Sequence, residues 1–295
     1  MPPDKRELQS SHIGGFQGWL PSEKPDPREY RSGEMRLRTG IRVLDDMLSG
    51  GFLPGDAVLL AGGAGTGKTT LALQHLVNGA TQFGENGVYV TFEQLPAQVY
   101  RDGVSFGWDL RKLEDENKFR LICTSPQLLL ETGGGESLLS EPIREVRPQR
   151  IVIDSLSHLA MYTDRDELRR ELYRLIMLLK ARGLSSILIW ESSDSWGYSS
   201  SLSDGGISFL VDCVLLLKPV EIESSVRKAM FVLKMRGSDH DKSLRQYEIT
   251  SHGVEVSAPF SDYEGLMTGS PRRSITEQAA SNWAMAFAKN KQKHS

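Results

Sequence analysis

Residues 57–69 read Ala57-Val-Leu-Leu-Ala-Gly62-Gly-Ala-Gly-Thr-Gly67-Lys68-Thr69, an apolar run of strand length followed by a glycine-rich loop. The loop matches G-x-x-x-x-G-K-[ST], in which glycines let backbone N–H groups curl around phosphate oxygens. A helix predicted over 68–82 adds the positive end of its dipole. The stretch therefore predicts a strand–loop–helix unit that binds a nucleotide through its phosphates. The predicted nucleotide-binding residues are Gly62, Gly63, Ala64, Gly65, Thr66, Gly67, Lys68, Thr69 and Thr70.

Apolar runs of strand length alternate with helical segments from about Met35 to about Ala258. This alternation predicts an α/β fold, with a mainly parallel twisted sheet and helices on both faces. The clearest helix covers 166–182, and Gly183 is placed to end it. Short segments at 231–234, 246–250 and 254–256 predict an antiparallel edge. The predicted strands are 57–61, 88–92, 119–122, 151–153, 186–190, 209–217 and 229–235.

Composition argues against one class of protein and excludes another. The chain has 295 residues and a net charge of −3, which argues against a coat of basic residues for nucleic acid. It has no run of about 18 apolar residues, so a membrane-spanning helix is excluded. The polar start MPPDKRELQS has no apolar signal region, and we expect a cytoplasmic protein. Cys123 and Cys213 lie in apolar stretches and are predicted to be buried free thiols.

Three regions are expected along the chain. Residues 1–35 contain five prolines and no periodicity, which predicts a flexible arm. Residues 36–257 are predicted to be one folded domain, and residues 258–295 a tail with a short amphipathic helix. The capping box Ser274-Ile-Thr-Glu277 opens that helix. It either packs on its own body or the next subunit, or docks a protein partner. Its apolar stripe is Ile275, Ala279, Trp283 and Phe287.

Two carboxylates complete a candidate site. Asp154 ends the buried run Arg150-Ile-Val-Ile-Asp154, the Walker B pattern. Asp154 and the hydroxyl of Thr69 are therefore predicted to hold Mg²⁺. Glu93 follows the strand at 88–92, and the carboxyl ends of parallel strands face the ligand crevice. Glu93 could there orient a water molecule toward the terminal phosphate. The alternative is a surface glutamate before a helix that begins near Pro96.

Six stretches, in order along the chain, share a pattern with one family: 39–55, the Walker A loop at 62–69, 90–93, 105–110, 154–157 and 234–237. Together they resemble the KaiC-like branch of the RecA/DnaB superfamily. The resemblance covers about residues 36–257. It implies a RecA-like P-loop ATPase domain that binds ATP and Mg²⁺ between the subunits of a homo-oligomeric ring, usually a hexamer. Two-domain clock members of the family carry two such bodies, and this chain carries one.

The resemblance also assigns residues near the end of the domain. Lys234 and Arg236 match cations that reach the nucleotide of the neighbouring subunit as trans-acting fingers. They alternate along a strand, so their side chains point to one face. Ser238 and His240 follow where relatives approach the nucleotide. The alternative is that Lys234 and Arg236 are two solvated charges on an edge strand.

Two departures from the family pattern bear on activity. The family often has Glu-Glu where this chain has Glu93-Gln94, so we expect slow hydrolysis. Clock relatives phosphorylate an adjacent Ser-Thr pair, where this chain has Ser208-Phe209. One of the two hydroxyls is lost, which argues against autokinase activity at a paired site.

Three functions stay open. The first is an ATPase whose turnover switches a signalling or regulatory assembly. The second is a DNA recombination or repair ATPase of RecA/RadA type. The third is a scaffold that holds ATP without hydrolysing it. Residues 191–217 contain no Lys or Arg but four acidic residues, so nucleic acid is not the expected partner.

Overall fold

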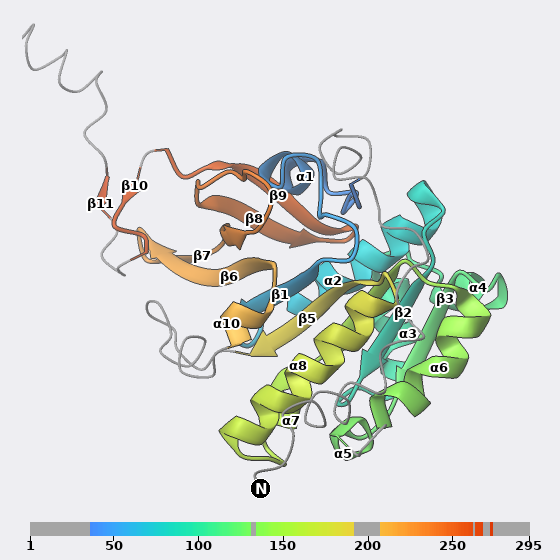
Figure 1. The fold of residues 1–295 in the computed structure, drawn as a ribbon. Coiled ribbons are helices and arrows are strands. Elements are labelled where there is room, and N and C mark those ends of the chain that lie inside the picture. The colour runs from blue at the N-terminus through green and yellow to red at the C-terminus, as the bar shows by residue number, and fades with distance from the viewer. Residues whose placement is uncertain (1–35, 131–133, 192–206, 262, 268–271, 274–295) are drawn as a thin grey trace, which may run out of the picture.

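A single nine-stranded sheet forms the centre of the described chain, which in this computed structural model comprises residues 36–130, 134–191, 207–261, 263–267 and 272–273 (Figure 1). The strand order is β3-β2-β4-β5-β1-β6-β7-β8-β9. The pairings from β3 to β6 are parallel, and those from β6 to β9 are antiparallel. The predicted mainly parallel sheet with an antiparallel edge is confirmed.

The elements have the following bounds. The sheet contains β1 (Ala57–Gly62), β2 (Gly87–Thr91), β3 (Phe119–Cys123), β4 (Arg150–Asp154), β5 (Ser185–Glu191), β6 (Cys213–Ile222), β7 (Ser225–Met235), β8 (Arg245–Thr250) and β9 (Gly253–Pro259). The helices are α1 (Arg42–Met47), α2 (Lys68–Asn78), α3 (Pro96–Ser105), α4 (Leu110–Asp115), α5 (Pro126–Leu130), α6 (Gly134–Val146), α7 (Leu156–Leu159), α8 (Arg165–Ala181) and α10 (Ile207–Leu210). A π-helical turn, η2 (Gly79–Phe83), follows α2, and a separate ribbon pairs β10 (Tyr263–Glu264) with β11 (Arg272–Arg273).

The central strands are buried on both faces because their alternate side chains enter two different cores. On β1, Val58 and Leu60 belong to one core, while Ala57, Leu59 and Ala61 belong to the other. The first core is covered by α1–α4, and the second by α5–α8 and α10. Figure 1 shows α6 and α8 in front of the sheet and α2 behind it. Helices therefore cover both faces, as predicted.

Helix α8 shows how closely a local pattern can define an element. The carboxylate of Asp164 caps its first turn by accepting a hydrogen bond from the backbone N–H of Glu167 at 2.9 Å. Gly183 ends it with a left-handed φ of +69°. The prediction of a helix at 166–182 is confirmed to within one residue at each end. Its buried face is Leu168, Leu172, Leu175, Ile176 and Leu179.

The predicted strand at 209–217 is wrong in its first part. Residues 207–210 form α10, and pairing with β1 begins at Cys213, opposite Val58. The apolar run is not uniformly buried, since the side chain of Phe209 is 66% exposed. The helix predicted over 68–82 ends as α2 at Asn78 and continues as η2.

Only one of the two cysteines is buried. Cys213 is buried, as predicted, but Cys123 is exposed because it is the last residue of the edge strand β3. Both are free thiols. The prediction of a buried Cys123 is therefore wrong, since an apolar strand at a sheet edge has one uncovered side.

Two predicted regions lie outside the described residues: the arm at 1–35 and the amphipathic helix that opens at Ser274. The described part of the tail includes Leu266, which packs with Val220, Ile222 and Ala229 in a small third core. Among the described residues, no helix combines the length and the apolar character that crossing a membrane requires.

Candidate functional site

The predicted phosphate loop joins the end of β1 to the start of α2. A side chain at either of two of its glycines would meet a neighbouring strand. A Cβ on Gly62 would lie 2.4 Å from the carbonyl oxygen of Leu217. Gly67 has a φ of +88°, and its Cβ would lie 2.5 Å from Cδ1 of Ile249. The neighbouring strands β6 and β8 therefore fix the shape of the loop.

Lys68 folds its side chain back over the loop. Its Nζ donates a hydrogen bond to the carbonyl oxygen of Gly63 at 2.8 Å, and the hydroxyl of Thr66 donates to the same oxygen at 2.8 Å. Burial lowers the pKa of Lys68, and the carboxylates of Glu191 and Asp154 oppose that change. The ammonium group is thus held at the centre of the loop, where a phosphate would lie.

Two side chains from the antiparallel strands also bind the loop. Nζ of Lys228, on β7, donates to the carbonyl oxygen of Gly65 at 2.6 Å. The buried hydroxyl of Tyr247, on β8, donates to the carbonyl oxygen of Thr66. Neither residue is predicted from the sequence. Their only local signal is a polar side chain in a strand, which does not show what it faces.

Asp154 is placed beside the loop by β4. Its Oδ2 accepts hydrogen bonds from the hydroxyl of Thr69 at 2.7 Å and from the hydroxyl of Tyr89 at 2.8 Å. Burial raises the pKa of Asp154, and the hydrogen bonds from Thr69 and Tyr89 oppose that change. The structure thus brings the two predicted metal ligands together and adds Tyr89, which the sequence analysis missed.

Glu93 lies just beyond the carboxyl end of β2, at the same edge as Asp154. The hydroxyl of Thr91 accepts the backbone N–H groups of Glu93 and Gln94 at 3.3 and 3.2 Å, which fixes the turn. The side chain of Glu93 is 66% exposed, and its Oε2 lies 3.8 Å from Nε2 of His158. The carboxylate is therefore free to turn toward a ligand in the crevice.

Lys234 and Arg236 lie at the opposite end of the strands from the loop. The backbone N–H of Arg236 donates to the carbonyl oxygen of Asp212, and that of Asp212 donates to Ala57, the first residue of β1. The loop begins at the last residue of the six-residue β1, which spans roughly 17 Å at about 3.3 Å per residue. Lys234 and Arg236 therefore cannot reach their own loop.

Both predicted fingers contact α10. Nζ of Lys234 donates to the carbonyl oxygens of Ser208 and Val211, at 2.8 Å each. One terminal nitrogen of Arg236 donates to the carbonyl oxygen of Phe209 at 2.9 Å. The two side chains thus point to one side, as the alternation predicts.

Ser238 and His240 lie in the segment that links β7 to β8, near Arg236. The hydroxyl of Ser238 accepts a hydrogen bond from Arg36 at 2.7 Å. The backbone N–H of His240 donates to the carboxylate of Asp239 at 2.9 Å. Both residues thus lie at the same edge of the sheet as Lys234 and Arg236, and not at the edge that carries the loop.

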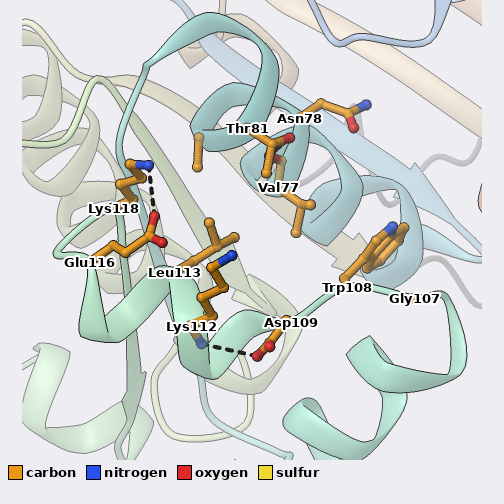
Figure 2. Close-up of a pocket in the computed structure, with 11 residues that line it drawn as sticks. Val77, Asn78, Thr81, Gly107, Trp108, Asp109, Lys112, Leu113, Glu116 and Lys118 are labelled. Atoms are coloured by element: carbon orange, nitrogen blue, oxygen red, sulfur yellow. Dashed lines mark hydrogen bonds and ion pairs between the residues drawn. The ribbon is translucent and has the colours of Figure 1, made fainter.

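A separate pocket of about 550 Å³ lies against the C-terminal end of α2 (Figure 2). Val77 and Asn78 line one side of it, and Trp108 and Lys112 line the other. Lys68 begins the same helix, ten residues before Asn78 or about 15 Å away at 1.5 Å per residue. The pocket is therefore distinct from the phosphate loop.

The side chains beside the loop fit a nucleotide that is bound together with Mg²⁺. Thr69 and Asp154 offer one hydroxyl and one carboxylate, and Mg²⁺ is usually held by one or two such groups together with phosphate oxygens. Among the described residues, no group of three or more His, Cys, Asp or Glu side chains could hold a metal ion by itself. The lack of a side chain at Gly62 and Gly67 lets β6 and β8 approach the loop closely, which holds the curled backbone that phosphate binding needs.

Comparison with known proteins agrees with this geometry. The family model described as "ATPase: KaiC" matches residues 37–261. The circadian clock oscillator protein KaiC of Prochlorococcus marinus is 34% identical over 262 residues, which are 88% of this chain and 50% of that protein. That of Nostoc sp. is 36% identical over 252 residues, 84% of this chain and 48% of that protein. The KaiC protein of Thermostichus vulcanus is 35% identical over 251 residues, which are 84% of this chain and 47% of that protein.

The chain thus spans about half the length of these curated relatives. The match confirms the predicted RecA-like α/β fold and covers every predicted site residue. Since one family model describes most of the folded chain, the chain belongs to the KaiC ATPase family.

Proposed function

We propose that the chain forms a homo-oligomeric ring, binds Mg-ATP at the junctions between subunits and hydrolyses it slowly. Lys68 and the backbone N–H groups of the loop neutralise the phosphates. Thr69 and Asp154 would hold Mg²⁺, which offsets the negative charge that develops during phosphoryl transfer. Residues 62–70 would bind the nucleotide in one subunit, and Ser238 and His240 would approach it from the next.

Glu93 would orient the attacking water, because it lies at the carboxyl edge with its carboxylate exposed. The neutral Gln94 beside it supports slow turnover. Lys234 and Arg236 would stabilise the transferring phosphoryl group of the neighbouring subunit as fixed cations. Each junction thus has a complete set of groups only when two subunits meet.

The observation that carries the proposal is the placement of the two half-sites at opposite ends of β1. A subunit with the loop at one edge and the fingers at the other can pair head to tail with further copies, so that the fingers of one copy face the loop of the next. Such a contact closes into a ring when the rotation between copies allows it. A ring of six is the size that the resemblance implies.

The output of the ring rests on the relatives, which are named circadian clock oscillators. We propose that turnover switches a cytoplasmic regulatory assembly, with the helix predicted after Ser274 as a docking segment for a protein partner. Autophosphorylation is not part of the proposal, because Phe209 replaces one of the two hydroxyls. Nucleic acid is not part of it either, since 191–217 is acidic.

The test is phosphate release from Mg-ATP as a function of protein concentration, with Lys68→Ala as the blank and particle size measured on the same samples. Activity per subunit should rise steeply as the ring assembles. Activity that stays constant while the size changes would contradict a shared site. ATP binding without phosphate release would instead support the scaffold function.

A further inference from the structure

Asp212 joins β1 to the segment that carries the fingers. Its backbone pairs with Ala57 on one side and with Arg236 on the other. Its Oδ2 accepts a hydrogen bond from the backbone N–H of Ala57 at 2.9 Å and forms an ion pair with Nζ of Lys180 at 2.5 Å. Its Oδ1 lies 3.9 Å from a terminal nitrogen of Arg236. The side chain is only 13% exposed, so these contacts are shielded from water.

The fingers depend on the backbone just before Asp212. Lys234 donates to the carbonyl oxygens of Ser208 and Val211, and Arg236 donates to that of Phe209. These carbonyls fix both cations only as long as residues 208–211 keep their position. The carboxylate of Asp212 ties the end of that segment to β1 and to α8.

The charges at this edge favour the same role. Lys180, Lys234 and Arg236 bring three cations close together, and Asp212 is the carboxylate that ion-pairs with Lys180 and faces Arg236. Burial lowers the pKa of Lys234 and the charge of Arg236 lowers it further, while Asp212 opposes both effects. A fixed carboxylate thus keeps two like charges side by side in one orientation.

We propose that Asp212 is a positioning residue for Lys234 and Arg236, and that Lys180 supports it from α8. The inference rests on the proposed function, because it matters only if the fingers serve the neighbouring subunit. Asp212 touches no part of its own phosphate loop. Its loss should therefore impair the neighbour's site and leave its own intact.

The experiment uses mixed oligomers of the full chain. Asp212→Asn alone should lower kcat roughly ten- to hundredfold, because misplaced catalytic groups cost about that much. The KM for ATP should change less than about twofold, since uniform binding is retained. Mixed one to one with Lys68→Ala, Asp212→Asn should regain up to about a quarter of wild-type activity. Random assembly leaves that share of junctions with an intact loop and intact fingers.

Arg236→Ala mixed with Lys68→Ala is the reference for a finger defect and should recover in the same way. Glu221→Gln, an exposed carboxylate near the other end of β6, is the matched control and should behave as wild type. Lys180→Met removes the ion pair to Asp212 and leaves Asp212, Lys234 and Arg236 in the chain. It should cost about threefold in kcat, a smaller effect than moving the fingers themselves. In the mixture, activity counted per Lys180→Met subunit should rise about twofold, because half of its loops then face intact fingers.

The outcomes separate the two proposals. Recovery with Arg236→Ala but none with Asp212→Asn or Lys180→Met would overturn the positioning role, because Asp212 would then act on its own loop through β1. Wild-type kcat in Asp212→Asn would overturn it as well. If Arg236→Ala also fails to recover, the shared site itself is wrong, and the role of Asp212 falls with it.

Discussion

The hydroxyl of Thr69 lies 2.7 Å from Oδ2 of Asp154, although 85 residues separate the two in the chain. The contact joins the first turn of α2 to the end of β4. Asp154→Asn should keep an oxygen acceptor for Thr69 and Tyr89 but remove the negative charge. We expect the thermal midpoint to change little and ATP affinity to lose its dependence on magnesium.

Calorimetric titration with ATP, in magnesium and in EDTA, checks this prediction. Wild-type protein should bind ATP at least about tenfold more tightly with magnesium than in EDTA. That ratio corresponds to about 1.4 kcal/mol of binding free energy. The variant should bind equally in both buffers. A variant that keeps the full magnesium effect would remove Asp154 from the metal site.

Glu93 and Gln94 form a natural pair of opposite variants. Glu93→Gln removes the carboxylate that orients water, so phosphate release should fall by about 10²-fold or more while ATP binding is retained. Gln94→Glu adds a second carboxylate and should raise turnover a few-fold, roughly two- to fivefold. Single-turnover phosphate release measures both. Equal rates in wild type and Glu93→Gln would exclude Glu93 from the reaction.

Gly67→Ala should distort the phosphate loop. The new Cβ would meet Ile249 at 2.5 Å in a backbone with a φ of +88°. We expect a loss of about 1–3 kcal/mol in the free energy of unfolding, together with weaker ATP binding. Gly65→Ala is the control, because its φ is +72° but nothing lies within 4 Å of its Cβ. Chemical denaturation that shows the same loss for both variants would contradict a role for the contact.

The free energy of unfolding should depend on pH through Asp56. Burial raises the pKa of Asp56 to about 7 and nearby Asp212 adds to this, while Lys180 and Arg36 oppose it. The folded chain holds the proton of Asp56 more tightly than the unfolded chain does, so this proton stabilises the fold. The stabilisation is complete below about pH 4. It is lost as the pH rises to about 7.

Asp56→Asn should remove that dependence. Between pH 5 and pH 8 the variant should gain about 1–3 kcal/mol relative to the wild type, as the ionised form is no longer buried. Urea denaturation at both pH values measures the difference. Asp46→Asn, an exposed carboxylate on α1, should show no such gain. Parallel pH curves for Asp56→Asn and the wild type would disprove the buried charge.

The parts of the site that follow one another along the chain were predictable from sequence. The loop, α2 and the carboxylate that ends β4 each combine a local pattern with a position at a strand end. Helix α8 was predictable for the same reason, as its cap, its apolar face and its terminal glycine are all local. Local signals suffice where the chemistry and the backbone conformation depend on adjacent residues.

The parts that depend on distant contacts were not predictable. Lys228 and Tyr247 reach the loop only because β6 and β7 form a long hairpin that brings β8 alongside. Asp212 stands in an apolar run that predicts a strand, and its contacts depend on three elements that meet around it. An apolar run also could not reveal α10, since periodicity does not distinguish a short helix from a strand.

Because the loop and the fingers lie at the two ends of β1, the proposed ring would have a direction. Each subunit would receive help from one neighbour and give it to the other, and never the reverse. β1 is paired on both sides and can pass a shift at Gly62 to Ala57 as a stiff element. A nucleotide bound at one junction would then affect the next junction in one direction only, so successive sites could respond in a fixed order around the ring.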